Sequence, residues 1–120
     1  MSSENPRIER CQKSGKECLR FVFGERLTAV DAEAAVGEWR KIFQLENGAP
    51  RVLIWDCREM KGYDSAARIQ WTAALKELKR QIESIWLITD SSVIKMGASV
   101  MGMVSSIDIK VIRAENEIEV

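Results

Sequence analysis

A short apolar run in the middle of the chain constrains the fold more than any other feature. Residues 52–55 (VLIW) form an unbroken apolar stretch that ends at Asp56. A run this short, closed by a polar residue, is typical of a strand buried on both faces. Residues 56–63 are polar and include a glycine, which predicts a loop at the carboxyl end of that strand. Asp64 and Ser65 then open a helical pattern, because both residue types are favoured as caps for the unpaired N–H groups of a helix start.

The rest of the chain repeats this alternation of strands and helices. Two strands at 7–11 and 17–23 flank a turn at 13–16, and further strands are predicted at 85–89 and, near a sheet edge, at 107–112. Apolar periodicity predicts helices from Thr28 or Val30 to about Leu45, from 65 to about 82, and over 93–104. The order β-β-α-β-α-β-α-β predicts an α/β fold: a mixed central sheet of about four to five strands, with an N-terminal hairpin and helices packed against the sheet.

Each predicted helix has an apolar face that we expect to contact the sheet. Met96, Met101 and Met103 add apolar bulk to the third helix, as core filling or as the lining of a ligand groove. The expected core positions are Ala32, Val36, Trp39 and Phe43 in the first helix, Trp71, Leu75, Leu78 and Ile82 in the second, and Val93, Gly97, Val100 and Val104 in the third.

The predicted hairpin has a consequence for two of the three cysteines. If Ser14 and Gly15 form a two-residue loop, Cys11 and Cys18 lie opposite each other on adjacent strands. Two readings follow: a disulfide, or two free thiols as in a reducing compartment.

Composition limits the class of protein. The 120 residues predict one domain over 1–120, with 1–6 as a flexible end. Lys plus Arg and Asp plus Glu both number 18, which argues against nucleic acid as the main partner. No apolar run is long enough to predict membrane insertion, the N-terminus lacks the apolar centre of a signal peptide, and the odd number of cysteines fits reduced thiols. We therefore expect a cytoplasmic protein.

The sequence gives little support for catalysis. The chain contains no histidine, which removes the commonest acid–base group and transition-metal ligand, and it has no glycine-rich nucleotide motif. Cys57 follows a buried strand and is either a reactive thiol or a buried, inert one. Asp56, Asp64 and Asp90 either cluster at strand ends or are three solvated loop acids. We expect no enzyme, no cofactor and no metal.

Ser65 is the clearest candidate for regulation. Phosphate at a helix N-terminus meets free N–H groups and a favourable dipole, and the added charge changes what the surface binds. The alternative is that Ser65 is a plain N-cap.

The ordered motifs resemble the STAS domain family, which includes bacterial anti-sigma-factor antagonists. The resemblance covers about residues 7–114 and rests on Gly24-Glu25-Arg26-Leu27, on the apolar strand with Asp56, and on Asp64-Ser65 at a helix start. It implies a non-enzymatic switch, in which a partner that is both a Ser/Thr kinase and an anti-sigma factor phosphorylates Ser65. The partner-binding residues that we expect are Asp56, Arg58, Lys61, Tyr63, Asp64, Ser65 and Arg68.

The sequence departs from this family at two places. Family members continue with Ser and Gly where this chain has Ala66 and Ala67, and the final helix is short or absent. The missing helix would leave one sheet face apolar and open to a second copy, as in a homodimer, or to another partner.

Two other functions are alternatives to the phosphorylation switch. The first is a carrier or sensor of a small apolar, lipid-like ligand, with Trp39, Trp71, Trp86 and the methionines around a pocket; the same residues are otherwise ordinary core. The second is an enzyme that uses Cys57, which ranks last because no histidine can activate the thiol.

Overall fold

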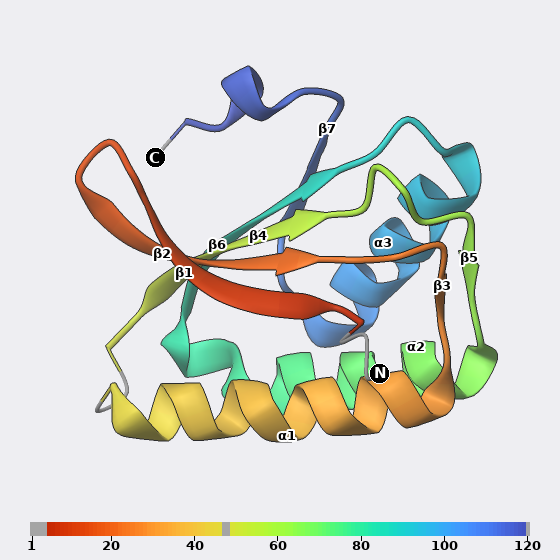
Figure 1. The fold of residues 1–120 in the computed structure, drawn as a ribbon, viewed down its shortest axis with the longest axis horizontal. Coiled ribbons are helices and arrows are strands. Elements are labelled where there is room, and N and C mark those ends of the chain that lie inside the picture. Colours follow the sequence, from red (N-terminus) through yellow and green to blue (C-terminus); the bar gives the residue numbers. More distant parts are fainter. Residues whose placement is uncertain (1–4, 47–48, 120) are drawn as a thin grey trace.

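A computed structural model describes residues 5–46 and 49–119. Its main sheet has five strands in the order β1-β2-β4-β6-β7 (Figure 1). β1 pairs antiparallel with β2, and the other neighbours are parallel, so the sheet is mixed as predicted. The strands are β1 (Arg7–Lys13), β2 (Lys16–Val22), β4 (Arg51–Asp56), β6 (Ile82–Ile88) and β7 (Ile109–Ile112).

All three long helices, α1 (Ala29–Leu45), α2 (Ser65–Leu78) and α3 (Ser92–Ser105), lie on one face of this sheet (Figure 1). The reason is topological. From β2 to β7 each crossover leads to the next parallel neighbour in the same direction, and right-handed crossovers in one direction place their helices on one side. We call this the helical face and the opposite side the second face.

The core on the helical face is built around four aromatic rings. The ring of Phe21 meets Trp39 edge to face, with centroids 5.3 Å apart, and meets Trp71 in the same way at 5.8 Å. Trp55 lies 6.0 Å from Trp71. Such edge contacts suit the quadrupoles of the rings and add to the free energy gained by burial. Trp39 and Trp71 belong to the helix faces that periodicity predicted.

The second face is covered by the C-terminal segment instead of a helix. Residues 113–119 cross above it, with a single 3-10 turn, η2 (Glu115–Glu117) (Figure 1). The expectation of an open apolar sheet face is wrong, because every apolar residue of this cluster is buried. The cluster consists of Cys18, Val52, Ile54, Trp86, Ile88 and Ile112, with Cys11 and Ile118 packed at its margin.

The hairpin forms as predicted. Ser14 and Gly15 both have positive φ, 51° and 81°, the conformation of a two-residue turn that matches strand twist. Cys11 and Cys18 are therefore cross-strand partners, and both are free thiols.

The predicted start of α1 is confirmed. Thr28 caps it and accepts from the Asp31 amide at 3.1 Å, while Asp31 accepts from the Thr28 amide in return. This capping box satisfies two helix-end amides at once.

The second helix ends earlier than predicted. α2 stops at Leu78 and continues as a 3-10 turn, η1 (Lys79–Gln81). Ile82 is the first residue of β6, so its assignment to the helix stripe was wrong. An apolar residue at the right spacing cannot by itself distinguish the last helical turn from the first strand residue.

The face predicted for α3 is wrong at three of its four positions, because only Gly97 is buried. Val93, Val100 and Val104 are exposed, and so are Met96 and Met103. Of the three methionines, Met101 is half-buried and packs against the core, as predicted for core filling. The buried side is Ile94, Gly97, Ala98, Gly102 and Ser105. The helix is apolar nearly all round, so its periodicity defines no single stripe. Near the end of α3 the chain turns back past Gly102: the Ile107 amide donates to the Gly102 carbonyl at 3.0 Å, and a Cβ on Gly102 would stand 2.8 Å from the Ile107 carbonyl oxygen.

The prediction of a flexible end at 1–6 lies mostly outside the described residues. Where that stretch is described, Asn5 is held in place: its amide donates to the Arg26 carbonyl at 2.7 Å and accepts from the Gly24 amide at 2.8 Å. Pro6 is buried.

Candidate functional site

A second, two-stranded sheet organises the region around Ser65. β3 (Arg26–Leu27) pairs in parallel with β5 (Gly62–Tyr63), so the predicted loop at 56–63 ends in a short strand. The Asp64 amide donates to the Leu27 carbonyl at 2.9 Å. These pairings hold the N-terminal ends of α1 and α2 side by side.

Asp64 is the N-cap of α2, but its carboxylate does not cap its own helix. It accepts from Arg26, at 3.0 Å from Nε and 2.7 Å from Nη2, and from the Ala29 amide at 3.3 Å. The hydrogen bonds from Arg26 hold the pKa of Asp64 below its usual value. Asp64 therefore links β3, α1 and α2, and the first amides of α2 lack a side-chain cap.

Ser65 is the first residue of α2 and is exposed. The reading of Ser65 as a plain N-cap is wrong, because Asp64 holds that position. Arg68 lies one turn further along the same helix and is half-buried. Its guanidinium makes no ion pair or side-chain hydrogen bond with any residue that the structure describes. An uncapped helix start and an unpaired cation thus lie together beside a free hydroxyl.

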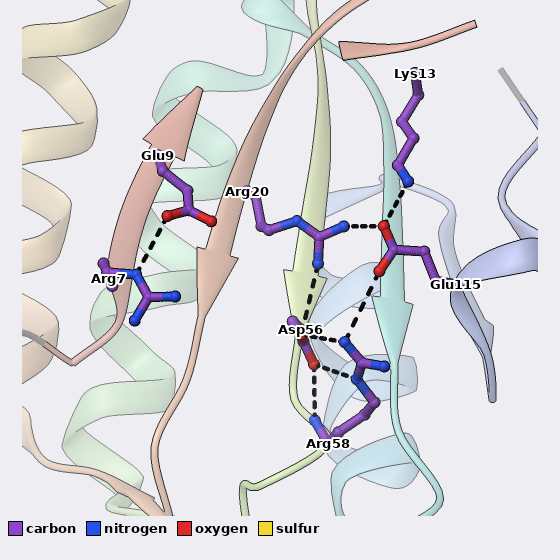
Figure 2. A network of polar contacts seen from close by, with 7 residues as sticks. All are labelled: Arg7, Glu9, Lys13, Arg20, Asp56, Arg58 and Glu115. Carbon is purple, nitrogen blue, oxygen red and sulfur yellow. Dashed lines mark hydrogen bonds and ion pairs between the residues drawn. The ribbon is translucent and has the colours of Figure 1, made fainter. Parts of the chain in front are cut away.

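Asp56 lies on the second face, at the end of β4, in a polar network (Figure 2). Arg58 binds its carboxylate through two atoms, with Nε at 2.9 Å and Nη2 at 2.7 Å, and Arg20 Nη1 lies 3.5 Å away. Glu115 pairs with Arg20, with Lys13 Nζ at 2.5 Å and with Arg58 at 3.8 Å. Reading Asp56 as a solvated loop acid was wrong, because it is buried. The pKa of the Asp56 carboxyl is lowered, chiefly by its hydrogen bond with Arg58.

The structure divides the predicted partner-binding residues into two groups. Tyr63, Asp64, Ser65 and Arg68 lie together at the start of α2, where Tyr63 contacts the core of the helical face. Asp56 and Arg58 belong to the second face. Lys61 is exposed between β3 and β5, with its nearest acid, Glu25, at 3.9 Å. In the described ranges the three acids Asp56, Asp64 and Asp90 do not come together as a ligand group: Asp56 pairs with Arg58, Asp64 pairs with Arg26, and Asp90 is exposed.

Sequence reasoning missed several residues of both groups. Arg26 was read only as part of a motif, and Arg20 and Glu115 were not considered. Arg20 and Glu115 are 95 positions apart, and no local pattern connects them. For Arg20 a signal existed: it is a charged residue between apolar neighbours in a strand expected to be half-buried.

An apolar groove runs beside the Ser65 group. Its volume is about 410 Å³, and it lies between the start of α2 and the exposed side of α3. Val93 and Met96 remain 60% and 69% exposed along it. Its lining is Tyr63, Arg68, Ser92, Val93, Met96, Gly97 and Val100.

A smaller apolar cavity lies behind the groove, between the sheet, α2 and α3. Its volume is about 50 Å³, and Tyr63, Arg68 and Gly97 line both spaces. Trp71 lines this cavity, as the apolar-ligand hypothesis expects, but Trp39 and Trp86 do not. Trp39 is fully buried in the core, and Trp86 belongs to the second face.

Cys57 lies at the wall of this cavity and is buried. Burial raises the pKa of its thiol far above the usual range, and the neighbouring Asp56 charge acts in the same direction. A thiol in such surroundings is present as the weakly nucleophilic neutral form.

Residues 5–46 and 49–119 contain no side-chain group suited to a metal ion and no helix suited to a membrane. Within these ranges no three His, Cys, Asp or Glu side chains come together as ligands for a metal ion. None of the helices in the described ranges has the length and apolar character to cross a bilayer.

Comparison with known proteins identifies the architecture. No family model matches the sequence, and no curated protein matches it. Among solved structures, the fold is similar to that of an uncharacterized protein of the DUF3478 family from Shewanella loihica PV-4, which has a SpoIIAA-like fold. The TM-score is 0.78 at 15% sequence identity, and the match covers 98% of this chain and 94% of that chain. The chain therefore has a SpoIIAA-like, STAS-like fold, as the sequence resemblance implied.

Proposed function

We propose that the protein is a non-enzymatic regulatory module of the cytoplasm that binds a protein partner and is switched by phosphorylation of Ser65. The observation that carries this proposal is the exposed hydroxyl of Ser65 at the first position of α2, one turn before the unpaired Arg68. The partner that the STAS resemblance implies is an anti-sigma factor that is also a Ser/Thr kinase.

The binding surface is the groove between α2 and α3. Exposed apolar side chains grouped in a concave surface are typical of protein-binding sites, and Val93, Met96 and Val100 form such a group. Arg68 lies in the same groove, so one cation borders the apolar surface.

Phosphorylation would change the charge of this surface. A phosphoserine adds a charge of about −1.5 to −2, which the helix start and Arg68 both attract. Residues three apart on a helix are neighbours, so the phosphate and the Arg68 guanidinium can pair. Arg68 would then be withdrawn from the partner, so we expect the phosphorylated form to bind the partner less well.

The first test is phosphopeptide mapping of the segment around Ser65, in protein isolated from its own cells during growth and under stress. Phosphate on Ser65 in either condition is the expected result. A well-covered Ser65 peptide without phosphate in every condition would refute the switch.

The second test compares partner capture by Ser65→Asp with capture by the unmodified chain. Ser14→Asp is the matched control, because it adds the same charge at the exposed tip of the β1–β2 hairpin, away from α2 (Figure 1). We expect Ser65→Asp to lose the partner and Ser14→Asp to keep it. Equal capture by both variants would contradict the proposal.

A second candidate function is the binding of a small apolar ligand. The apolar cavity behind Tyr63 favours it, because this cavity meets the surface groove at residues common to both. Its volume of about 50 Å³ is far below the roughly 300 Å³ that ligand pockets need, so Tyr63 must move before a ligand enters. Native mass spectrometry of purified protein, with Tyr63→Ala as an opened variant, tests this. Repeated absence of an adduct in both forms would exclude it.

A further inference from the structure

The C-terminal segment is attached to the second face by side chains alone. Within the described part of the chain, residues 113–119 make no backbone hydrogen bond to any strand. Their internal bonds close a turn instead: Glu117 accepts from the Arg113 and Ala114 amides at 3.0 and 2.9 Å, and the Ile118 amide donates to the Glu115 carbonyl at 3.1 Å. The segment therefore resembles a short folded peptide laid on the sheet.

Glu115 supplies the polar part of this attachment. Lys13, Arg20 and Arg58 surround its carboxylate and form a basic cluster (Figure 2). On the sheet side, Asp56 forms ion pairs with Arg20 and Arg58, and Glu59 acts on Arg58 through its charge alone. When Glu115 is set aside, Arg20 and Arg58 share one ion-paired carboxylate, and Lys13 keeps no ion pair with a residue that the structure describes. Arg20 is only 13% exposed, and without Glu115 it would keep only the longer contact to Asp56, at 3.5 Å, which it shares with Arg58. A buried cation with so little compensating charge is costly.

Ile118 supplies the apolar part. It packs at the margin of the buried cluster that contains Ile54 and Trp86. Glu115 and Ile118 are the two half-buried residues of the segment, whereas Arg113, Ala114, Asn116, Glu117 and Glu119 are exposed. The contact thus depends on an acid and on an apolar residue three positions later.

We propose that this face is a docking site for an acidic peptide segment of a partner protein, and that residues 113–119 occupy the site in the free protein. The incoming segment would carry a glutamate for the basic cluster and an apolar residue three positions on, as Glu115 and Ile118 do. The site lies on the face opposite α1, α2 and α3, so the inference does not depend on the Ser65 switch.

The chemistry of the site favours a peptide over a nucleic acid. A phosphate backbone could satisfy the cations, but it has no group for the apolar position that Ile118 fills. The buried Asp56 carboxylate would also repel a run of phosphates. An acidic peptide satisfies both the charge and the apolar surface.

Competition between the two occupants governs binding. A segment tethered a few residues from its site acts at an effective concentration of the order of millimolar. A free peptide therefore binds the unmodified chain weakly, and it binds more tightly when the tethered segment is weakened.

The experiment uses the full chain with Glu115→Gln and Ile118→Asn, and a fluorescent synthetic peptide of sequence RAENEIE. We expect this double variant to bind the peptide at least about tenfold more tightly than the unmodified chain does, with affinity falling as salt rises. Adding Arg20→Gln to the double variant, or replacing the first glutamate of the peptide by glutamine, should abolish binding.

Circular dichroism must show that each variant is folded, and the milder single variant Glu115→Gln serves if the double variant is not. A folded variant that binds no peptide would overturn the proposal. Binding that Arg20→Gln leaves unchanged, or equal binding of an oligonucleotide, would overturn it as well.

Discussion

The phenol of Tyr63 lies directly against the backbone of Gly97. A Cβ built on Gly97 would stand 2.9 Å from Tyr63 Cζ and nearer still to the hydroxyl oxygen, so any other residue at this position requires the Tyr63 ring to move. This contact brings β5 onto α3, and both residues line the apolar cavity as well as the groove outside it.

Gly97→Ala should therefore displace the Tyr63 ring. We expect overpacking to cost about 1–3 kcal/mol of unfolding free energy, only partly offset by about 1 kcal/mol of better helix propensity. Urea denaturation measures the net loss of unfolding free energy, and binding of a hydrophobic dye reports the opened cavity.

Gly37→Ala is the matched control. A Cβ at position 37 in α1 meets nothing within 4 Å, so this substitution should raise the unfolding free energy by about 0.5–1 kcal/mol. In a Gly97→Ala background, Tyr63→Ala should cost less than it does alone; additive losses would show that the two residues do not interact.

Charge at Ser65 should affect stability with a definite sign. The start of α2 lacks a side-chain cap and carries no acid in its first turn, so Ser65→Asp should be at least as stable as the unmodified chain. Ser65→Lys should lose about 0.3–1 kcal/mol, because a cation opposes the dipole there. Chemical denaturation at low and at high salt measures the unfolding free energy of each variant. Because salt screens the charges, the difference between Ser65→Asp and Ser65→Lys should be smaller at high salt. A Ser65→Asp variant that unfolds would show that this position cannot accept a phosphate.

Acid should lower the unfolding free energy of the protein by protonating carboxylates of the network around Asp56. The pKa values of Asp56 and Glu115 are both lowered in the folded state, by hydrogen bonds from Arg58 and from Lys13 respectively. A lowered pKa means that the unfolded chain binds protons more readily. The stabilisation is thus complete above the ordinary carboxyl pKa of about 4 and is lost as pH falls through the lowered values.

Asp56→Asn tests this origin. At neutral pH it should cost about 1.5–3 kcal/mol, the range for hydrogen bonds to charged groups. Between about pH 5 and pH 2 its unfolding free energy should change less than that of the unmodified chain. An equally steep acid loss in the variant would place the pH dependence elsewhere.

The three thiols should differ in reactivity. Cys18 and Cys57 are buried and burial raises the pKa of each, whereas Cys11 is half-buried. A thiol reagent at about pH 8 should label Cys11 first, and Cys57 only after denaturation. Cys11→Ser should remove the fast phase. Rapid labelling of Cys57 in the native protein would revive the thiol-enzyme hypothesis.

The parts of the fold that depend on local patterns could be predicted from the sequence. The hairpin and its Cys11–Cys18 pairing follow from a two-residue turn, and the core face of α1 follows from apolar spacing. The order of elements, joined to the handedness of crossovers, leads to the mixed sheet with helices against it.

The candidate site was predicted only in part. Asp64 and Ser65 were placed correctly at a helix start, but Asp56 and Arg58, a few positions earlier, lie on the opposite face of the sheet. Successive side chains of a strand point to opposite faces of the sheet. The direction of Asp56, the last residue of β4, therefore decides which face this residue belongs to. The orientation of α3 was predicted only at Gly97, whereas its three valines are exposed, because the helix is apolar nearly all round.

The sequence by itself determined what neighbouring residues decide: turns, caps, helix faces with clear periodicity, and the succession of strands and helices. The tertiary structure decided how distant residues meet. Glu115 crosses the second face to reach Arg20, 95 positions away, and the Tyr63 ring lies against the backbone of Gly97. Local patterns reflect the backbone geometry of a few residues, whereas these contacts satisfy charge and packing that arise only after the chain has folded.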